Sequence, residues 1–226
     1  MRIDELAQMI DHTNVNQGAT AADIAKLCNE ASKYGFHAVC VNPCHVKCAK
    51  DINKNLKIAA VVGFPFNYAD PSKKMEDADI ALKYGASELD MVWDLDAFRK
   101  SKYTRVERDI EHIVKMAKKC GPVAVKVIVE TCYLSKDDIK LACRLVAGGG
   151  ADYIKTSTGF AEKGADAKHI RIMSHAIKHN NLGIKIKAAG YIDSCEKAIE
   201  MVNAGASRIG CSKSVKIMEE AQKILK

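Results

Sequence analysis

The sequence predicts an α/β protein with the (β/α)8 TIM-barrel fold, built as a single domain over residues 1–226. Short Val- and Ile-rich runs alternate with longer amphipathic segments along the whole chain. Strict alternation places strands in parallel, and eight strands in 226 residues leave about 28 residues per strand–helix unit, which suits a barrel. An open doubly wound sheet is the alternative. It would usually carry a glycine-rich turn after the first strand, where this chain has Asp11-His12-Thr13-Asn14.

Eight segments of five to eight residues are predicted as strands. Most are rich in Val and Ile and are bounded by Gly, Asn or Asp, which is typical of buried strands between turns. They are Met9–Thr13, Ala38–Asn42, Ile58–Phe64, Ser87–Trp93, Val123–Glu130, Asp152–Thr158, Gly183–Gly190 and Arg208–Ser212.

Amphipathic segments between these strands are predicted as helices. In Ala21–Tyr34, for example, Ile24, Leu27 and Ala31 share one face. The other segments are Met75–Tyr84, Val106–Lys119, Ile139–Ala147, Ala167–Lys178 and Cys195–Asn203. Glycine adopts the left-handed conformation that ends a helix at little cost. Such glycines stand before the next strand at Gly35, Gly85, Gly150 and Gly205.

Composition excludes several classes of protein. Apolar stretches such as Ile58–Val62 are far shorter than the roughly 20 residues of a membrane span. The first ten residues contain acids where a signal peptide would be apolar, so we expect a mature cytoplasmic protein. The 35 basic residues exceed the 28 acidic ones, but they are spread along the chain, and aromatic residues make up only 6%. We therefore expect neither a nucleic-acid nor a membrane partner.

The chain contains nine cysteines, which we expect to be reduced thiols. Cys40, Cys44 and Cys48, with His45, are the one suggestive cluster for a metal. Cys40 ends a predicted strand while Cys44 and Cys48 open a helix, so these thiols are not expected to converge. Small apolar filler is the favoured interpretation, and no metal is expected.

Ionisable residues inside the predicted strands are the most informative feature for function. Because helices cover the outside of a barrel, these charges are expected to face its interior. Lys126 and Glu88 fit a structural ion pair. Lys155 and Lys187 fit that role poorly, since they lie late in adjacent strands, at the end where barrels carry their active sites.

Two lysines placed close together repel each other's charge, so one of them becomes a neutral, nucleophilic amine near pH 7. An amine attacks a carbonyl group to form a Schiff base, which acts as an electron sink for making or breaking a carbon–carbon bond. Asp90, on the fourth predicted strand, is placed to carry protons across the barrel mouth. From the residues alone, the chain is expected to be a metal-free lyase or aldolase.

Several segments resemble the deoxyribose-phosphate aldolase family, in order from about residue 9 to residue 215. The Lys-Thr-Ser-Thr-Gly-Phe run that starts at Lys155 is the most specific of them. The segments are Ile10-Asp11-His12-Thr13, Val39-Cys40-Val41-Asn42-Pro43, Val61-Val62-Gly63-Phe64-Pro65, Glu88-Leu89-Asp90-Met91-Val92, Lys126-Val127-Ile128-Val129-Glu130-Thr131, Gly150-Ala151-Asp152-Tyr153-Ile154-Lys155-Thr156-Ser157-Thr158-Gly159-Phe160, Lys187-Ala188-Ala189-Gly190 and Ala204-Gly205-Ala206-Ser207-Arg208-Ile209-Gly210.

This resemblance implies a class I aldolase on a (β/α)8 barrel. Such an enzyme cleaves 2-deoxy-D-ribose 5-phosphate reversibly to D-glyceraldehyde 3-phosphate and acetaldehyde, without a metal or other cofactor. It implies that Lys155 forms the Schiff base and that Lys187 is the neighbouring cation that keeps it uncharged. Asp90 is implied as the acid/base residue acting through an ordered water, with Thr158 beside that water. The side chains implied to line the pocket are Asp11, Thr13 and Cys40.

The chain departs from the family pattern at the phosphate end. Gly190 is followed by Tyr191 where the family usually has a second glycine, and Asp193 stands where it usually has an arginine. A carboxylate there repels a phosphate, whereas Lys213, at the start of the last helix, attracts it. The phosphate site is expected at Gly159, Gly190, Gly210, Ser212 and Lys213.

Two other functions stay open. A Schiff-base lyase for a different or non-phosphorylated sugar is motivated by Tyr191 and Asp193, and a barrel that binds a sugar phosphate without catalysis is the other. Lys155, Lys187 and Asp90 argue against the latter. The expected ligands are a sugar phosphate and aldehydes, and the expected assembly is a homodimer.

Overall fold

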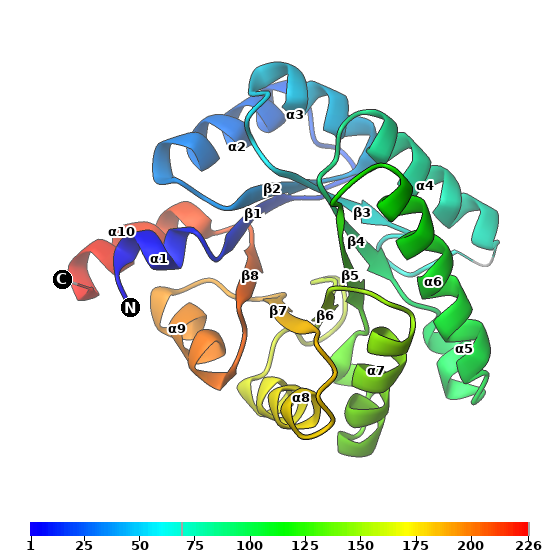
Figure 1. The fold of residues 1–226 in the computed structure, drawn as a ribbon. Helices are drawn as coiled ribbons and strands as arrows, with labels where there is room; N and C mark the ends of the chain where they lie inside the picture. Colours follow the sequence, from blue (N-terminus) through cyan, green and yellow to red (C-terminus); the bar gives the residue numbers. More distant parts are fainter. Residues whose placement is uncertain (69, 226) are drawn as a thin grey trace.

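Eight parallel strands close into one barrel in chain order, from β1 to β8 and back to β1 (Figure 1). The computed structural model describes residues 1–68 and 70–225. The strands are β1 (Ile10–Asn14), β2 (Ala38–Val41), β3 (Ile58–Val62), β4 (Glu88–Val92), β5 (Ala124–Ile128), β6 (Tyr153–Lys155), β7 (Lys185–Ala189) and β8 (Arg208–Cys211). The predicted (β/α)8 barrel is confirmed, and the open doubly wound sheet is excluded.

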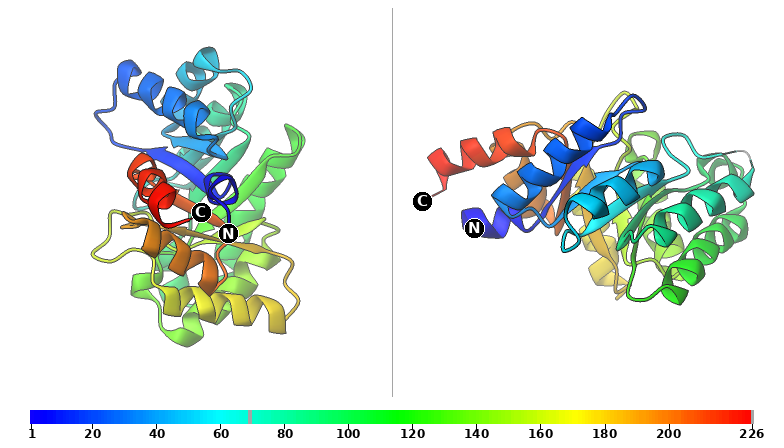
Figure 2. Two further views of the ribbon diagram at one scale, coloured as in Figure 1. Left: turned by 90° about the vertical axis from the view of Figure 1, so that its left-hand side faces the viewer. Right: turned by 90° about the horizontal axis from the view of Figure 1, so that it is seen from above.

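Helices surround the barrel on the outside (Figure 1). They are α1 (Ile3–Ala7), α2 (Ala21–Tyr34), α3 (Val46–Ile52), α4 (Pro71–Lys83), α5 (Leu95–Arg99), α6 (Tyr103–Lys119), α7 (Lys136–Gly148), α8 (Ala167–His179), α9 (Cys195–Ala204) and α10 (Ser214–Ile224), with short 3-10 turns at Pro43–His45 and Thr131–Tyr133. The first and last helices, α1 and α10, lie side by side, so the two ends of the described chain are close together (Figure 2). None of the described helices has the length and apolar character needed to cross a bilayer.

Local sequence signals fix where these helices begin and end. Thr20 caps α2 by accepting the backbone N–H of Asp23, and Ser135 caps α7 in the same way. All four glycines predicted to turn the chain toward the next strand have positive φ, from 67° at Gly35 to 121° at Gly205. The turn chemistry read from the sequence is therefore confirmed.

Several predicted boundaries were wrong. Strand β5 ends at Ile128 rather than Glu130, because Glu130 has a left-handed backbone with φ 51° and ψ 68°. Strand β6 ends at Lys155, three residues before the predicted end, since the chain turns there into the loop that borders the cavity. The short helices α1 and α5 were not predicted, because five residues are too few to establish a helical period.

Alternation along the strands separates two environments. Outward-facing residues such as Leu89 and Met91 belong to the large apolar core beneath the helices. Inside the barrel, a small separate cluster of Cys40, Ala59 and Val61 is apolar. Much of the remaining interior is charged, and the strand register places Lys155 beside Lys187 and Asp90 beside Lys126. The barrel thereby concentrates ionisable groups that are up to 197 positions apart in the chain.

Candidate active site

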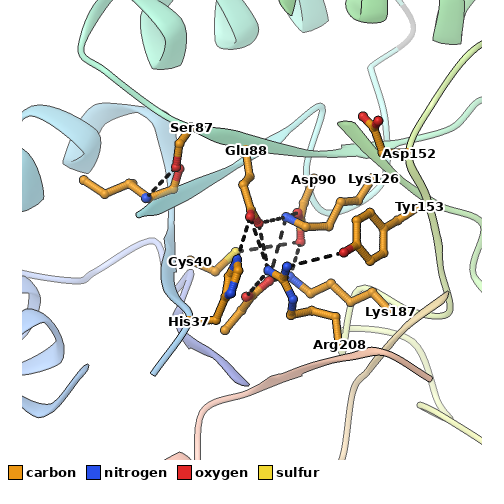
Figure 3. A network of polar contacts seen from close by, with 12 residues as sticks. His37, Cys40, Ser87, Glu88, Asp90, Lys126, Asp152, Tyr153, Lys187 and Arg208 are labelled. Carbon is orange, nitrogen blue, oxygen red and sulfur yellow. Dashed lines mark hydrogen bonds and ion pairs between the residues drawn. The ribbon is translucent and has the colours of Figure 1, made fainter. Parts of the chain in front are cut away.

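Seven ionisable side chains form one buried cluster inside the barrel. Figure 3 labels Glu88, Asp90, Lys126, Lys187 and Arg208 among them. Each of the seven is at most 6% exposed, and each comes from a strand, from β1, β4, β5, β6, β7 or β8. They are Asp11, Glu88, Asp90, Lys126, Lys155, Lys187 and Arg208. Buried charges are tolerated only when they are paired, so the contacts within this cluster decide its properties.

The carboxylate of Asp90 is the centre of the cluster. Its Oδ1 accepts a hydrogen bond from Lys126 Nζ at 2.7 Å, and its Oδ2 accepts from Lys155 Nζ and Lys187 Nζ, each at 2.7 Å. Burial by itself would raise the pKa of Asp90. The three ammonium groups outweigh that effect and hold the pKa of this carboxyl well below its usual range, so Asp90 is ionised at neutral pH.

A second set of contacts anchors the cluster beside Glu88. Lys126 Nζ lies 2.6 Å from Glu88 Oε2, and Arg208 Nη1 lies 3.1 Å from the same oxygen and 2.9 Å from Asp11 Oδ1. His37 Nε2 is 3.0 Å from the other Glu88 oxygen. The predicted ion pair between Lys126 and Glu88 is confirmed. It is not separate from the two lysines, however, because Asp90 joins all of them.

Lys126 and Lys187 are both firmly held as cations. Burial opposes their charge, but nearby carboxylates outweigh it and raise the pKa of each ammonium above its ordinary value. For Lys187 these carboxylates are Asp11, to which it donates a hydrogen bond, and Asp90. Lys155 has Asp90 as its ion-pair partner in the described chain. The cluster holds three carboxylates and four basic groups, and Lys155 has the fewest carboxylate contacts.

A cavity of about 500 Å³ opens beside Lys155. Lys155 is the one member of the charged cluster that lines this cavity, while Asp90 and Lys187 are fully buried behind it. Thr13 and Cys40, both predicted to line the pocket, do so. The same prediction was wrong for Asp11. Its side chain is fully buried and forms ion pairs with Lys187 and Arg208, and it does not line the cavity.

All five residues expected at the phosphate end line the same cavity. They are Gly159, Gly190, Gly210, Ser212 and Lys213. Tyr191 and Asp193 line it as well, so both departures from the family pattern face the site. The backbone of Gly190 has φ 89° and that of Tyr191 has φ 55°. Gly210 has a further reason to lack a side chain, because a Cβ there would lie 2.9 Å from Cε of Lys187.

The cysteines do not gather at a metal site. Cys40 is buried beside Asp90, with its Sγ 3.9 Å from Oδ2, whereas Cys44 is exposed and Cys48 half-buried. Among the described residues, no three His, Cys, Asp or Glu side chains are arranged to hold a metal ion. Burial raises the pKa of the Cys40 thiol to about 11, so it is protonated at neutral pH.

Two contributors to the site were not predicted from the sequence. Arg208 begins β8 and completes the charged cluster; the signal that could have found it is the same one used for the lysines, an ionisable residue inside a strand. Glu130 was given no role beyond ending the fifth predicted strand, but its carboxylate accepts hydrogen bonds from Thr158. No contact joins Thr158 to Asp90 among the described residues, so the water expected between them stays a prediction.

The geometry of the site is that of a Schiff-base-forming barrel enzyme. A (β/α)8 barrel in which a strand lysine, Lys155, lines the cavity and contacts a buried carboxylate shared with a second lysine is suited to Schiff-base chemistry on a carbonyl compound. Residues 5–212 match the family model described as DeoC/LacD family aldolase. The chain belongs to this family.

Individual relatives are named consistently. The chain is 46% identical to the deoxyribose-phosphate aldolase of Aciduliprofundum boonei over 97% of this chain and 98% of the relative. It is also 46% identical to that of Thermococcus kodakarensis, over 96% and 97% of the two chains. Among solved structures, the tetrameric deoxyribose phosphate aldolase of Aeropyrum pernix superimposes with a TM-score of 0.91 at 33% identity, covering 99% of this chain and 93% of the other.

The charged cluster predicts how stability depends on pH. The pKa values of Glu88 and Asp90 lie below their ordinary values, so the folded chain binds fewer protons there than the unfolded chain. Their contribution is therefore fully present above the ordinary carboxyl pKa of about 4 and is lost as pH falls further, toward the folded values. We expect the free energy of unfolding, measured with urea between pH 7 and pH 3, to fall below about pH 4.

Glu88→Gln provides the comparison for this titration. The variant should lose about 3–5 kcal/mol at pH 7, because Lys126 and Arg208 each lose a carboxylate partner. Its unfolding free energy should then depend less steeply on pH below 4, because one of the two shifted carboxyls is gone. An equal slope for both proteins would contradict this account of the cluster.

Proposed function

We propose that this protein is a class I deoxyribose-phosphate aldolase, which reversibly cleaves 2-deoxy-D-ribose 5-phosphate to D-glyceraldehyde 3-phosphate and acetaldehyde. The observation that carries the proposal is the position of Lys155, whose amine borders the cavity and contacts Asp90. The names of the relatives at 42–46% identity over nearly the full chain support the choice of substrate.

The reaction follows from one neutral amine. Lys155 attacks the aldehyde carbon of the open-chain sugar, water leaves, and the iminium that forms takes up the electrons of the C2–C3 bond as it breaks. The C3 hydroxyl loses its proton in the same step. Asp90 is ionised and so is in the state to accept this proton, through a water in the cavity. Glyceraldehyde 3-phosphate leaves first, and protonation and hydrolysis of the remaining enamine release acetaldehyde.

Lys187 lies deeper in the barrel than Lys155 and contributes a positive charge next to it. Its ammonium is fully buried against Asp11 and Asp90 and keeps the cluster one positive charge in excess while Lys155 is protonated. A fixed cation next to an amine favours the neutral form of that amine, which is the form that attacks a carbonyl group.

The phosphate of the sugar is assigned to the turn between β8 and α10. Backbone N–H groups at the start of a helix and its positive dipole end attract anions, and Lys213 adds a full charge. A Schiff-base lyase for a non-phosphorylated sugar is the second candidate, since Asp193 lines the same cavity and opposes an anion. The third alternative, a barrel without catalysis, lacks a reason for the arrangement of Lys155, Lys187 and Asp90.

Small molecules are the ligands under either enzyme proposal. The domain limits at residues 1 and 226, the homodimer and the cytoplasmic location, all expected from the sequence, stay predictions. The tetramer named for the Aeropyrum pernix relative is a property of that protein.

Borohydride trapping tests the nucleophile. Reduction in the presence of acetaldehyde should leave one ethyl group on Lys155, detected by peptide mass spectrometry, and Lys155→Ala should abolish the labelling. Labelling of Lys187 with Lys155 unmodified would overturn the assignment.

Removing the second lysine tests the charge argument. Lys187→Leu removes from the cluster a cation that lies beside Lys155 and shares Asp90 with it, and a neighbouring cation favours the neutral form of an amine. We expect kcat at pH 7 to fall by about 10²-fold or more, with partial recovery at higher pH. A pH–rate profile that coincides with that of the parent would mean that Lys187 is only structural.

Two substitutions test the phosphate end. Asp193→Arg should lower KM for deoxyribose 5-phosphate, with a smaller effect on deoxyribose, because a charge pair about 4 Å apart is worth about 1 kcal/mol in water. Lys213→Ala should raise KM for the phosphorylated sugar. If neither variant changes the ratio of the two KM values, these side chains do not contribute to phosphate affinity.

A further inference from the structure

A buried carboxyl group outside the charged cluster, that of Glu130, contacts a residue of the cavity wall, Thr158. Glu130 follows β5 and is 7% exposed. Its left-handed backbone is unusual for a residue with a side chain, and hydrogen bonds to the neighbouring strand hold the chain on both sides of it. Val129 N–H donates to Lys155 O at 3.0 Å, and Thr131 N–H donates to Thr156 O at 2.9 Å. The strained turn is therefore fixed by β6, and its side chain reaches Thr158.

One oxygen of Glu130 binds Thr158 twice. Oε2 accepts the backbone N–H of Thr158 at 3.1 Å and also accepts its hydroxyl proton in a short hydrogen bond. The other oxygen, Oε1, is buried and has no partner among the described residues. Burial raises the pKa of Glu130, and the Thr158 bonds and the charge of Lys155 offset only part of that rise. Nothing in the aldol chemistry above uses this carboxyl.

The hydrogen-bond inventory of Thr158 determines what it presents to a ligand. A hydroxyl has one proton and two lone pairs. The proton of Thr158 is committed to Glu130, and one lone pair accepts the N–H of Phe160 at 3.1 Å. Thr158 lines the cavity, so what remains there is an acceptor. Without Glu130, the hydroxyl would be free to rotate and to donate instead.

We propose that Glu130 is a positioning residue that turns the Thr158 hydroxyl into a fixed hydrogen-bond acceptor for a hydroxyl group of the bound sugar. The inference rests on the proposed function and deepens it. It assigns to Glu130 and Thr158 the recognition of the hydroxyl next to the carbonyl carbon of the acceptor aldehyde. An acceptor without that hydroxyl gains nothing from the pair.

The synthetic direction gives the sharpest test, because acceptors that differ by one hydroxyl can be compared. With acetaldehyde as donor, kcat/KM is measured for 2-hydroxypropanal and for propanal, and their ratio reports recognition of the hydroxyl. Glu130→Asp keeps the charge and tolerates the left-handed backbone, but its shorter side chain withdraws from Thr158. We expect the ratio to fall about tenfold in this variant, the equivalent of about 1.4 kcal/mol, and to fall equally in Thr158→Val.

Glu130→Gln separates reach from charge. Its amide oxygen can accept the same two hydrogen bonds, so this variant should retain most of the parent ratio. The double variant, Glu130→Asp with Thr158→Val, should be no worse than either single variant, because both changes remove one interaction. Glu162→Ala is the matched control, because Glu162 is an exposed glutamate in the loop after β6 that also contains Thr158. This variant should behave like the parent.

Three results would overturn the inference: a ratio within twofold of the parent in Glu130→Asp, a loss in Glu130→Gln as large as in Glu130→Asp, or multiplicative losses in the double variant. Trapping of acetaldehyde on Lys155, measured in every variant, keeps the two proposals distinct. Absence of trapping in the parent defeats the proposed function. Trapping that persists with an unchanged acceptor ratio defeats only the role of Glu130.

Discussion

The amino groups of three lysines all donate hydrogen bonds to one carboxylate, that of Asp90, and the rest of the site is arranged around these contacts. A fully buried carboxylate is costly unless it is surrounded by donors, and a buried ammonium is costly without a carboxylate. Each group therefore fixes the others. The barrel meets this requirement, because the three lysines on β5, β6 and β7 and the carboxylate on β4 all point into one interior.

The cluster contains fewer carboxylates than basic groups, and this imbalance affects both its stability and its chemistry. Asp11, Glu88 and Asp90 face four basic groups, and Lys126, Lys187 and Arg208 each contact at least two of the three acids. Lys155 contacts Asp90 and borders the cavity. The same contacts that hold the inner groups charged thus leave the amine with the fewest carboxylate partners at the wall of the cavity.

Around this amine, the cavity is divided by the strands that border it. Lys213 and the start of α10 make one end favourable to an anion, while Glu130 and Thr158 belong to the loops after β5 and β6. Tyr191 and Asp193 lie at the wall between β7 and α9, where the family pattern has small and basic residues. The proposed Schiff-base amine ends β6, the proposed anion site lies between β8 and α10, and the proposed hydroxyl recognition joins the loops after β5 and β6.

Much of this protein could be derived from its sequence, since the relevant signals are local. Alternating strand and helix patterns predicted the barrel, glycines after helices predicted the turns, and charged residues inside strands indicated Lys155, Lys187 and Asp90 as candidate site residues. Strand boundaries were predicted less well. The end of β5, for example, is set by hydrogen bonds from Val129 and Thr131 to the end of β6 and the residue after it. What only the tertiary structure decided is the pairing. It joins Lys126 to the two other lysines through Asp90, buries Asp11 behind the cavity, adds Arg208 to the cluster and directs Thr158 toward Glu130. Sequence patterns report which face of a strand a residue occupies, whereas the partner of a buried charge depends on the register and closure of eight strands, which no local segment contains.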